Sequence, residues 1–250
     1  MRGLEIHVLA SGSDGNSAVF CADGTSIMVD AGLSGRALER LMGEAGLDPG
    51  QMSALLITHE HGDHCRGAGV LARRYGMPVY ATGGTLANCR IGKVEDPRPI
   101  AQLGTFQVGP VEVKALPIPH NASEPCAFSL SYRDRRCLVA TDLGRVTPGL
   151  RAEMEGTDLL MMEANHDLDM LLKGDYPTFL KRLIRGSTGH LSNAECAQAL
   201  RDLEDPSRKV FLAHLSRNNN TPELAMETVG ESVPGHDLCC LEGEVRTVSI

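Results

Sequence analysis

Residues 58–64, THEHGDH, limit the possible fold of this chain more than any other stretch. Three imidazoles and two carboxylates fall within six residues, directly after the apolar run 54–57. Such a run predicts a buried strand, and loops at strand ends are where folds place reactive groups. A solvated polar turn is the alternative, but chance rarely gathers three histidines in six residues. The stretch therefore predicts an active site at the end of a buried strand.

The spacing inside this loop indicates metal binding. His59 and His61 are two residues apart, so in an extended chain their side chains point the same way. Asp63 and His64 are adjacent and must point differently. One metal ion could lie on the side of His59 and His61, and another beside Asp63 and His64. The zinc-protease helix H-E-x-x-H does not fit, because residue 63 is Asp and Gly62 argues against a helix.

The same arrangement recurs elsewhere, because several apolar strands are followed by a residue that can bind metal. These residues are His59, His120, Asp142, His166 and His214. A lone histidine is usually structural, but five coincidences at strand ends indicate one site. Imidazole and carboxylate without thiolate suit catalytic zinc, manganese or iron. Two such ions ~3.5–4 Å apart can clamp the attacking and leaving oxygens of a phosphoryl displacement.

Composition sets the broad class. The 250 residues are 42% hydrophobic, enough for one globular domain that spans residues 1–250. There is no apolar run long enough to cross a membrane and no signal peptide. Eight scattered cysteines without a C-x-x-C pair predict free thiols and a cytoplasmic location. A net charge of −8 disfavours binding nucleic acid by bulk charge, but bound ions would supply local positive charge to a nuclease.

Periodicity and turn signals predict a layered α+β domain with helices interleaved among strands. Ser192 and Glu195 form a capping box at the start of one helix. The predicted strands are 4–9, 18–21, 26–29, 54–57, 78–81, 105–108, 111–116, 127–131, 137–140, 159–162 and 210–213, with two short ones closing the chain. The predicted helices are 34–45, 67–75, 176–184, 192–203 and 222–231.

At this point a family resemblance is clear. The motif H-x-H-x-D-H at 59–64, with His120, Asp142 and His214, resembles the signature of the metallo-β-lactamase superfamily. That resemblance implies an αββα sandwich, two mixed β-sheets flanked by helices, with two metal ions at one edge. Longer strings are similar to those of the YycJ/WalJ (VicX) group of bacterial DNA exonucleases. They are SGSDGN at 11–16, TDLG at 141–144, EANHD at 163–167, GHLSN at 189–193 and AHLS at 213–216.

The resemblance implies seven metal ligands in two sets that share one bridging carboxylate. The first ion would be held by His59, His61 and His120, the second by Asp63, His64 and His214, and the bridge would be Asp142. The ions would be zinc, manganese or iron. Asp63, Asp142 and His190 would take part in catalysis, with His190 stabilising or protonating the departing oxygen.

The resemblance also suggests supporting residues. Asp30 would hydrogen-bond the histidine loop, or simply end its strand. His190 resembles the ribonuclease Z histidine that lies against the scissile phosphate, and we expect it beside a helix N-terminus, where a phosphate is favoured.

Three further residues have weaker sequence signals. Ser13 and Asn16 lie in a loop of small residues and could donate hydrogen bonds to a substrate, although a plain turn explains the loop equally well. His166 has no counterpart among the seven ligands. We expect it to face the substrate or to support a ligand, with a structural role as the alternative.

The sequence therefore predicts a cytoplasmic dinuclear phosphodiesterase, most simply a 5′→3′ exonuclease that uses a metal-bound hydroxide and prefers DNA to RNA. No long arm of the ribonuclease Z type is present. Basic contacts to the strand would be local, and the candidates are Arg133, Arg135 and Arg136, or Lys181, Arg182 and Arg185. The alternatives are a hydrolase of a small phosphodiester or thioester, and a metal-binding regulatory protein without turnover. The sequence leaves the oligomeric state open.

Overall fold

The computed structural model describes residues 3–205, 208–241, 243 and 245–250. The chain forms two compact units. The first comprises Met1–Pro117, Ala122–Arg135 and Gly243–Ile250, and the second comprises Ile118–Asn121 and Arg136–Glu242. The description below takes each unit by itself. The predicted single domain over 1–250 remains a prediction.

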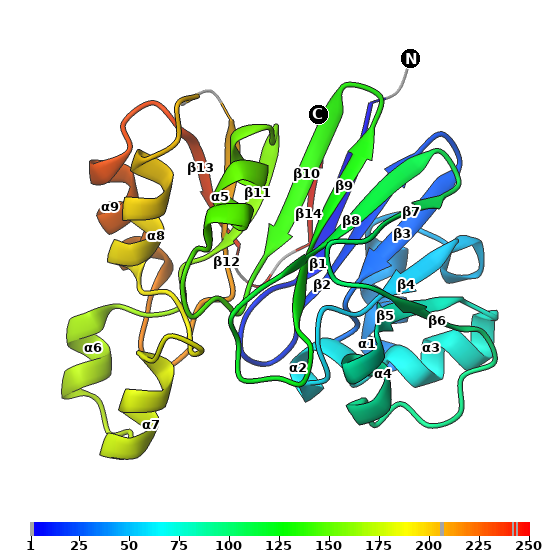
Figure 1. Ribbon diagram of the computed structural model, residues 1–250, viewed down its shortest axis with the longest axis horizontal. Coiled ribbons are helices and arrows are strands. Elements are labelled where there is room, and N and C mark those ends of the chain that lie inside the picture. Colours follow the sequence, from blue (N-terminus) through cyan, green and yellow to red (C-terminus); the bar gives the residue numbers. More distant parts are fainter. Residues whose placement is uncertain (1–2, 206–207, 242, 244) are drawn as a thin grey trace. The chain divides into compact units, whose positions relative to one another are not determined.

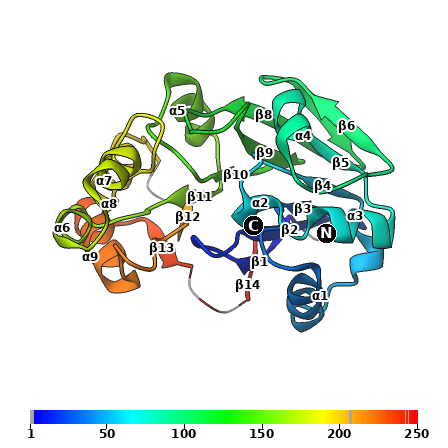
Figure 2. The ribbon, with the colours of Figure 1, turned by 90° about the horizontal axis from the view of Figure 1, so that it is seen from below.

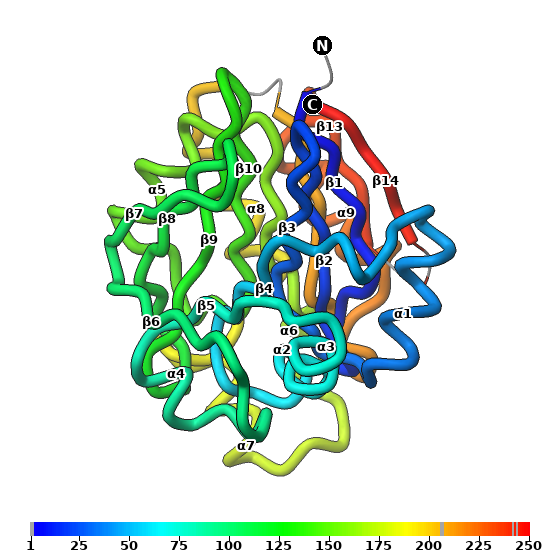
Figure 3. Tube along the Cα trace, turned by 90° about the vertical axis from the view of Figure 1, so that its right-hand side faces the viewer, coloured from blue at the N-terminus to red at the C-terminus, as the bar shows by residue number. Residues whose placement is uncertain are grey.

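The first unit is built on a seven-stranded sheet with the order β14-β1-β2-β3-β4-β5-β6. Its strands are β1 (Glu5–Ala10), β2 (Ser17–Ala22), β3 (Thr25–Val29), β4 (Ala54–Leu56), β5 (Val79–Thr82), β6 (Pro97–Ile100) and β14 (Arg246–Ser249). Strands β14, β1, β2 and β3 pair antiparallel, whereas β3 to β6 are parallel. Figure 3 shows β14 beside β1, where the two chain ends meet.

Two helices cover one face of this sheet. Helix α1 (Gly35–Glu44) begins at the predicted cap Ser34, whose side chain accepts from the Ala37 amide. Helix α3 (Ala68–Tyr75) ends at Gly76, which adopts the left-handed conformation that favours glycine. Leu38 of α1 and Leu71 of α3 pack with buried residues of β1 to β5 in one apolar core. Figure 2 shows both helices on the same side of the sheet.

The rest of the first unit is an antiparallel meander, with a short turn of 3-10 helix (Pro49–Gln51) and the helix α4 (Gly83–Asn88). The meander strands are β7 (Thr105–Val108), β8 (Val111–Pro117) and β9 (Cys126–Tyr132). The start of β9 is tied to the histidine loop, because the Cys126 amide donates to the Thr58 carbonyl at 3.0 Å. The meander therefore anchors the loop that follows β4.

The second unit has four parallel strands, β10 (Arg135–Ala140), β11 (Leu159–Glu163), β12 (Lys209–Ala213) and β13 (Asp237–Cys240). Its helices are α5 (Pro148–Glu155), α6 (Leu168–Lys173), α7 (Thr178–Ile184), α8 (Asn193–Arg201) and α9 (Pro222–Ser232). Helices α8 and α9 lie side by side in Figure 1. Parallel strands end at one edge of a sheet, so the residues after β10, β11 and β12 are neighbours there.

Three residues that follow strands have unusual backbones. Asp30, Asp142 and His214 have φ angles of 59°, 59° and 57°. Residues with a side chain rarely adopt this left-handed conformation, although Asp and His adopt it more readily than most. Such backbone strain, of about 1–3 kcal/mol per residue, concentrates at functional sites. Here it turns the chain sharply, immediately after β3 or close to the ends of β10 and β12.

The strands and helices predicted from the sequence are present with shifted boundaries, but six elements were missed: α2 (Gly62–Cys65), α4, α5, α6, β6 and the turn of 3-10 helix. One prediction was wrong, because Gly62 begins the one-turn helix α2. Glycine disfavours a helix because its backbone loses more entropy than others, but here the amides of His64, Cys65 and Arg66 all donate to carbonyls of this turn. Asp63 in that turn favours the helix, since its carboxylate interacts with the positive end of the helix dipole. No helix in the described part of the chain is both long and apolar enough to cross a lipid bilayer.

Candidate metal centre

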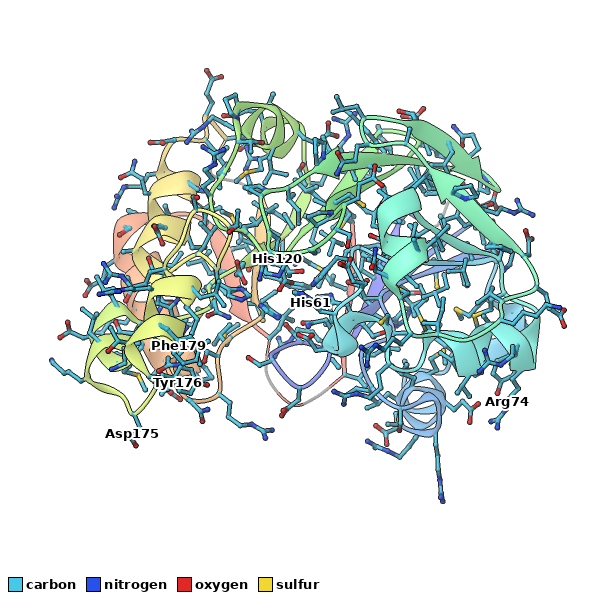
Figure 4. The ribbon with its side chains drawn as sticks, turned by 60° about the horizontal axis from the view of Figure 1, so that its bottom comes forward. His61, Arg74, His120, Asp175, Tyr176 and Phe179 are labelled. Carbon is cyan, nitrogen blue, oxygen red and sulfur yellow. The ribbon has the colours of Figure 1, made fainter. Side chains whose placement is uncertain are left out.

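The first unit carries four candidate ligands, His59, His61, Asp63 and His64, which we call the loop donor group. His59 Nε2 lies 3.0 Å from His61 Nδ1, and His64 Nε2 lies 3.5 Å from Asp63 Oδ2. Two atoms bound to one tetrahedral zinc at ~2.0–2.1 Å are roughly 3.4 Å apart. His59 and His64 are fully buried, and His61 lies beside α2 (Figure 4). The donors of this group are therefore already gathered at the separations that a metal ion requires.

Asp30 and Thr58 set the proton positions on two of these histidines. Asp30 Oδ1 accepts from the Thr58 amide at 2.8 Å, and Asp30 Oδ2 lies 2.8 Å from His64 Nδ1. A carboxylate only accepts, so His64 must donate from Nδ1, which leaves Nε2 able to bind metal. The Thr58 hydroxyl donates to Asp30 Oδ2 at 2.9 Å and lies 3.0 Å from His59 Nδ1. Because the only hydrogen of this hydroxyl goes to Asp30, the hydroxyl must accept from His59 Nδ1, which leaves Nε2 of His59 able to bind metal.

Asn16 closes this region from the loop between β1 and β2. Its amide donates to the Asp63 carbonyl at 2.8 Å, and its side-chain Nδ2 lies 3.1 Å from His64 Nε2. Asn16 Nδ2 therefore faces the same lone pair of His64 Nε2 that a metal ion would take. Gly32 is required for this approach, since a Cβ there would lie 1.7 Å from the Asp63 carbonyl oxygen. Ser13, on the same loop as Asn16, is exposed.

The second unit carries His120, Asp142 and His214, which we call the strand-end donor group. Nε2 of His120 and Nε2 of His214 each lie 3.6 Å from Asp142 Oδ1. Both distances exceed a hydrogen bond and match the spacing of ligands around a shared ion. All three side chains are buried. His120 Nδ1 donates to the Gly189 carbonyl at 3.2 Å, so its Nε2 is the atom left to bind.

Glu163, at the end of β11, organises the strand-end donor group and was missed from the sequence. Its Oε1 lies 2.8 Å from Nδ1 of both His190 and His214. Its Oε2 accepts from the amides of Leu143 at 2.7 Å and Leu191 at 3.1 Å. The sequence signal existed, because Glu163 directly follows the apolar run 159–162, as His214 follows its own.

The charge on Glu163 is settled by its histidine partners. Burial alone would raise the pKa of this carboxyl, but the charge of His190 and hydrogen bonds from His190 and His214 together lower it to about 2. Although the side chain is fully buried, these partners therefore keep it ionised at neutral pH. Because the carboxylate accepts from His214 Nδ1, it holds His214 in the form whose Nε2 can bind metal.

His190 is the most exposed member of this cluster, with 22% of its side chain accessible. Burial would lower its pKa, but the charge and hydrogen bond of Glu163 and the charge of Asp142 raise it overall. Its Nδ1 lies 3.8 Å from Asp142 Oδ1, and the Glu163 contact at 2.8 Å is the closer one. With Nδ1 directed at Glu163, the protonated form of this ring would carry an Nε2–H available for a proton transfer.

The N-terminus of α8, where a phosphate is expected beside His190, carries a capping box. The predicted capping box is confirmed, with Glu195 Oε2 accepting from the Ser192 amide at 2.8 Å and the Ser192 side chain accepting from the Glu195 amide. Two amides at this helix start, those of Ser192 and Glu195, thus already have partners within the capping box. His190 lies beside this helix start, but its partner is Glu163.

His166 lies deep in the second unit, with 1% of its surface exposed. Burial lowers its pKa, which favours the neutral ring. Its Nδ1 has no hydrogen-bond partner among the described residues, while its backbone carbonyl accepts from the Asn193 amide at 2.9 Å. This burial disfavours the substrate-facing role and leaves a supporting one.

Comparisons with solved structures identify the fold. The metallo-β-lactamase fold protein YhfI from Bacillus subtilis superimposes with a TM-score of 0.79 at 17% identity, covering 99% of this chain and 100% of that one. Zinc-bound PqqB from Methylobacterium extorquens gives a TM-score of 0.74 at 19% identity, with 98% and 100% covered. These structures confirm the predicted fold class, two mixed β-sheets flanked by helices.

Sequence comparisons identify the family. A family model described as "Beta-lactamase superfamily domain" matches residues 25–215. Exodeoxyribonuclease YycJ of Bacillus anthracis is 39% identical over 234 residues, which cover 92% of this chain and 89% of that protein. Exodeoxyribonuclease WalJ of Streptococcus pneumoniae strain D39 is 37% identical over 243 residues, which cover 94% and 90%. The chain therefore belongs to the metallo-β-lactamase superfamily and, within it, to the family of the exodeoxyribonucleases YycJ and WalJ.

Proposed function

We propose that this protein is a metal-dependent exodeoxyribonuclease that degrades DNA from the 5′ end in the cytoplasm. The observation that carries the proposal is the way the ligand histidines are held. His59, His64, His120 and His214 each have Nδ1 engaged by an oxygen of the protein, which leaves Nε2 for metal. Relatives named as exodeoxyribonucleases, at 37–39% identity over about nine-tenths of the chain, support the substrate class.

We infer that two divalent ions, of zinc, manganese or iron, complete the site. The first would be held by His59, His61 and His120, the second by Asp63, His64 and His214, and Asp142 would bridge them. The support is the sequence motif, the family and the donor spacing within each group. Ions in such a site lower the pKa of water to about 7 and neutralise charge on a phosphodiester.

The protein's own residues then orient the attacking oxygen and protonate the departing one. Asp63 and Asp142 fix the attacking oxygen in line with phosphorus through their carboxylates. As the phosphorus–oxygen bond to the leaving nucleoside breaks, His190 gives its Nε2 proton to the departing oxygen. Glu163, 2.8 Å from His190 Nδ1, holds that ring in place and stabilises its positive charge before the transfer. Such general acid catalysis contributes ~10²–10⁴-fold.

The experiment is digestion of single- and double-stranded DNA labelled at either end, by protein purified without chelator and analysed for metal content. We expect about two metal equivalents per chain, mononucleotides released first from the 5′ label, and no activity after chelation until metal is restored. Covalently closed circular DNA of the same sequence is the matched control and should persist. Equal degradation of the circle, or cleavage of small phosphodiesters alone, would overturn the proposal.

A further inference from the structure

The second unit exposes an aromatic side chain that its fold does not explain. Phe179 on α7 is 71% exposed, more than any other large hydrophobic residue in the described part of the chain. Aromatic residues make up only 4% of the sequence, and Phe20, Phe128 and Phe211 are buried. Figure 4 shows Phe179 near Tyr176 on the segment formed by α6 and α7. An aromatic ring presented in this way has no packing role in its own unit.

The helix that carries Phe179 is locally basic in an acidic protein. Residues 176–190 contain Lys181, Arg182 and Arg185 and no Asp or Glu, although the net charge of the chain is −8. Lys181 is used internally, since its Nζ donates to the carbonyls of Leu172 and Gly174. Arg182 and Arg185 are exposed.

These exposed residues share one side of the helix. Residues three apart are neighbours on a helix surface, so Phe179, Arg182 and Arg185 form one ridge. By contrast Arg136, from the other basic group predicted in the sequence, lies 3.5 Å from Glu153 and is partly neutralised. Of the two basic groups, the α7 ridge is the one that pairs exposed cations with an exposed ring.

This ridge is continuous with the strand-end donor group. The Ile184 carbonyl, at the end of α7, accepts from the His190 amide at 2.8 Å. Gly189 is needed for that contact, because a Cβ there would lie 2.1 Å from the same carbonyl oxygen. On the other side, the Tyr176 hydroxyl accepts from Asn218 at 2.8 Å, in the loop that follows His214. Helix α7 is thus fastened to the segments that bear His190 and His214.

We propose that this ridge receives the single-stranded end of the DNA substrate, with Phe179 stacking on a base and Arg182 and Arg185 holding the flanking phosphates. The inference rests on the proposed nuclease function. Every base has a π-face, so stacking tolerates any sequence and contributes ~1–3 kcal/mol per base. A processive or sequence-independent exonuclease needs such a contact, because hydrogen bonds to base edges would restrict it.

A second copy of the chain fits this ridge poorly. In a two-fold symmetric dimer the same patch meets itself, so Arg182 and Arg185 would face their own counterparts. Like charges brought together in this way are unfavourable. Single-stranded DNA suits this ridge better, because its phosphates are attracted to the two arginines and its bases can stack on Phe179.

The test compares Phe179→Ala and Phe179→Trp with Leu103→Ala, a matched control on the first unit whose side chain is 66% exposed. For a 5′-labelled single-stranded oligonucleotide, we expect Phe179→Ala to raise both KM and the dissociation constant by about 5- to 150-fold. Phe179→Trp and Leu103→Ala should behave like wild type. Hydrolysis of bis(p-nitrophenyl) phosphate should be unchanged in all three variants, because that substrate has no base to stack.

The outcomes separate the two proposals. Wild-type cleavage of DNA with an unchanged KM in Phe179→Ala would overturn the ridge inference alone. Binding of the oligonucleotide that depends on Phe179, without any cleavage, would keep the ridge and overturn the nuclease. Neither binding nor cleavage would overturn both. A change in sedimentation velocity of Phe179→Ala with an unchanged KM would show a contact between copies and refute the ridge inference.

Discussion

The loop and strand-end donor groups offer the same types of metal ligand, histidine and aspartate, but one group is contiguous in the sequence and the other is dispersed. The loop group takes four donors from six consecutive residues after β4. The strand-end group takes three donors from positions spread between residues 120 and 214, two of which follow parallel strands. In both groups a buried carboxylate accepts a hydrogen bond from a histidine Nδ1, and this carboxylate is Asp30 in one group and Glu163 in the other.

The two carboxylates differ in what they hold. Asp30 contacts His64 directly and reaches His59 through Thr58, so both histidines that it orients are candidate ligands. Glu163 contacts one candidate ligand, His214, and one residue outside the ligand set, His190, through the same oxygen. Asp30 would therefore serve metal binding alone, whereas Glu163 would join metal binding through His214 to proton donation through His190. Substitutions in the two groups should separate these tasks.

Removal of a metal ligand should cause the largest loss of activity, and the loss should be similar for ligands of either donor group. We expect His59→Ala and His214→Ala each to lose about one metal equivalent and to fall to the activity of chelated protein, because the remaining donors cannot complete a four-coordinate site. Asp142→Ala should lose both ions if it bridges them. Elemental analysis after dialysis, paired with initial rates on labelled DNA, measures this. Full metal content in Asp142→Ala would contradict the bridge.

His190→Ala should distinguish the strand-end group from the loop group. Because His190 is not needed to complete either ligand set, we expect metal content and fold to survive while kcat falls by ~10²–10⁴-fold. The loss should be smaller on a phosphodiester whose leaving group is p-nitrophenol, since that anion leaves without protonation. Loss of a metal equivalent from His190→Ala would show instead that His190 is a ligand.

The contrast between the groups also explains what could be predicted from the sequence. The loop group is contiguous, so HEHGDH alone was enough to predict its ligands. The strand ends at Asp142 and His214 were also found, because an apolar run followed by a polar residue is a local signal. Such local patterns indicate which residues are near strand ends, and the family resemblance supplied their grouping.

Glu163 and the environment of His190 required the folded structure. Glu163 follows an apolar run as His214 does, but that local signal cannot give its role, which depends on amides of Leu143 and Leu191 from distant loops. The one-turn helix at Gly62–Cys65 was missed because its stability comes from the tertiary setting and not from helix propensity. The phosphate site expected at α8 stays a prediction, and the structure adds that the capping box engages two of the amides at that helix start.

Substitution of the buried carboxylates should have intermediate effects that differ between the groups. We expect Asp30→Asn to weaken metal binding by roughly 10–100-fold, because an amide can let His64 protonate Nε2 in place of Nδ1. Its kcat at saturating metal should stay near wild type. Metal titrations followed by activity measure both quantities. A lower kcat at saturating metal would assign Asp30 a part in the chemistry.

Glu163→Gln should be more damaging than Asp30→Asn. All four partners of Glu163 are donors, so the Gln amide must face two of them with its own NH₂. Each buried donor left unsatisfied costs about 1–3 kcal/mol. We expect a lower Tm, weaker metal binding and a kcat that stays low at saturating metal. A variant that recovered full kcat with added metal would show that Glu163 does not act through His190.

The smallest effect is expected at Ser192, two residues from His190. Its substitution tests whether a disturbed start of α8, without loss of the His190 imidazole, is enough to lower kcat. Ser192→Ala removes the hydroxyl that accepts from the Glu195 amide, a cap worth about 0.5–2 kcal/mol of stability. Its backbone amide keeps Glu195 Oε2 as partner, so the other half of the capping box is preserved. We therefore expect a lower Tm and a kcat within about twofold of wild type, far from the ~10²–10⁴-fold loss of His190→Ala. Ser34→Ala is the matched control, because it removes the same kind of cap from α1. If Ser192→Ala reduced kcat as strongly as His190→Ala while Ser34→Ala did not, the start of α8 would have to bind the substrate after all.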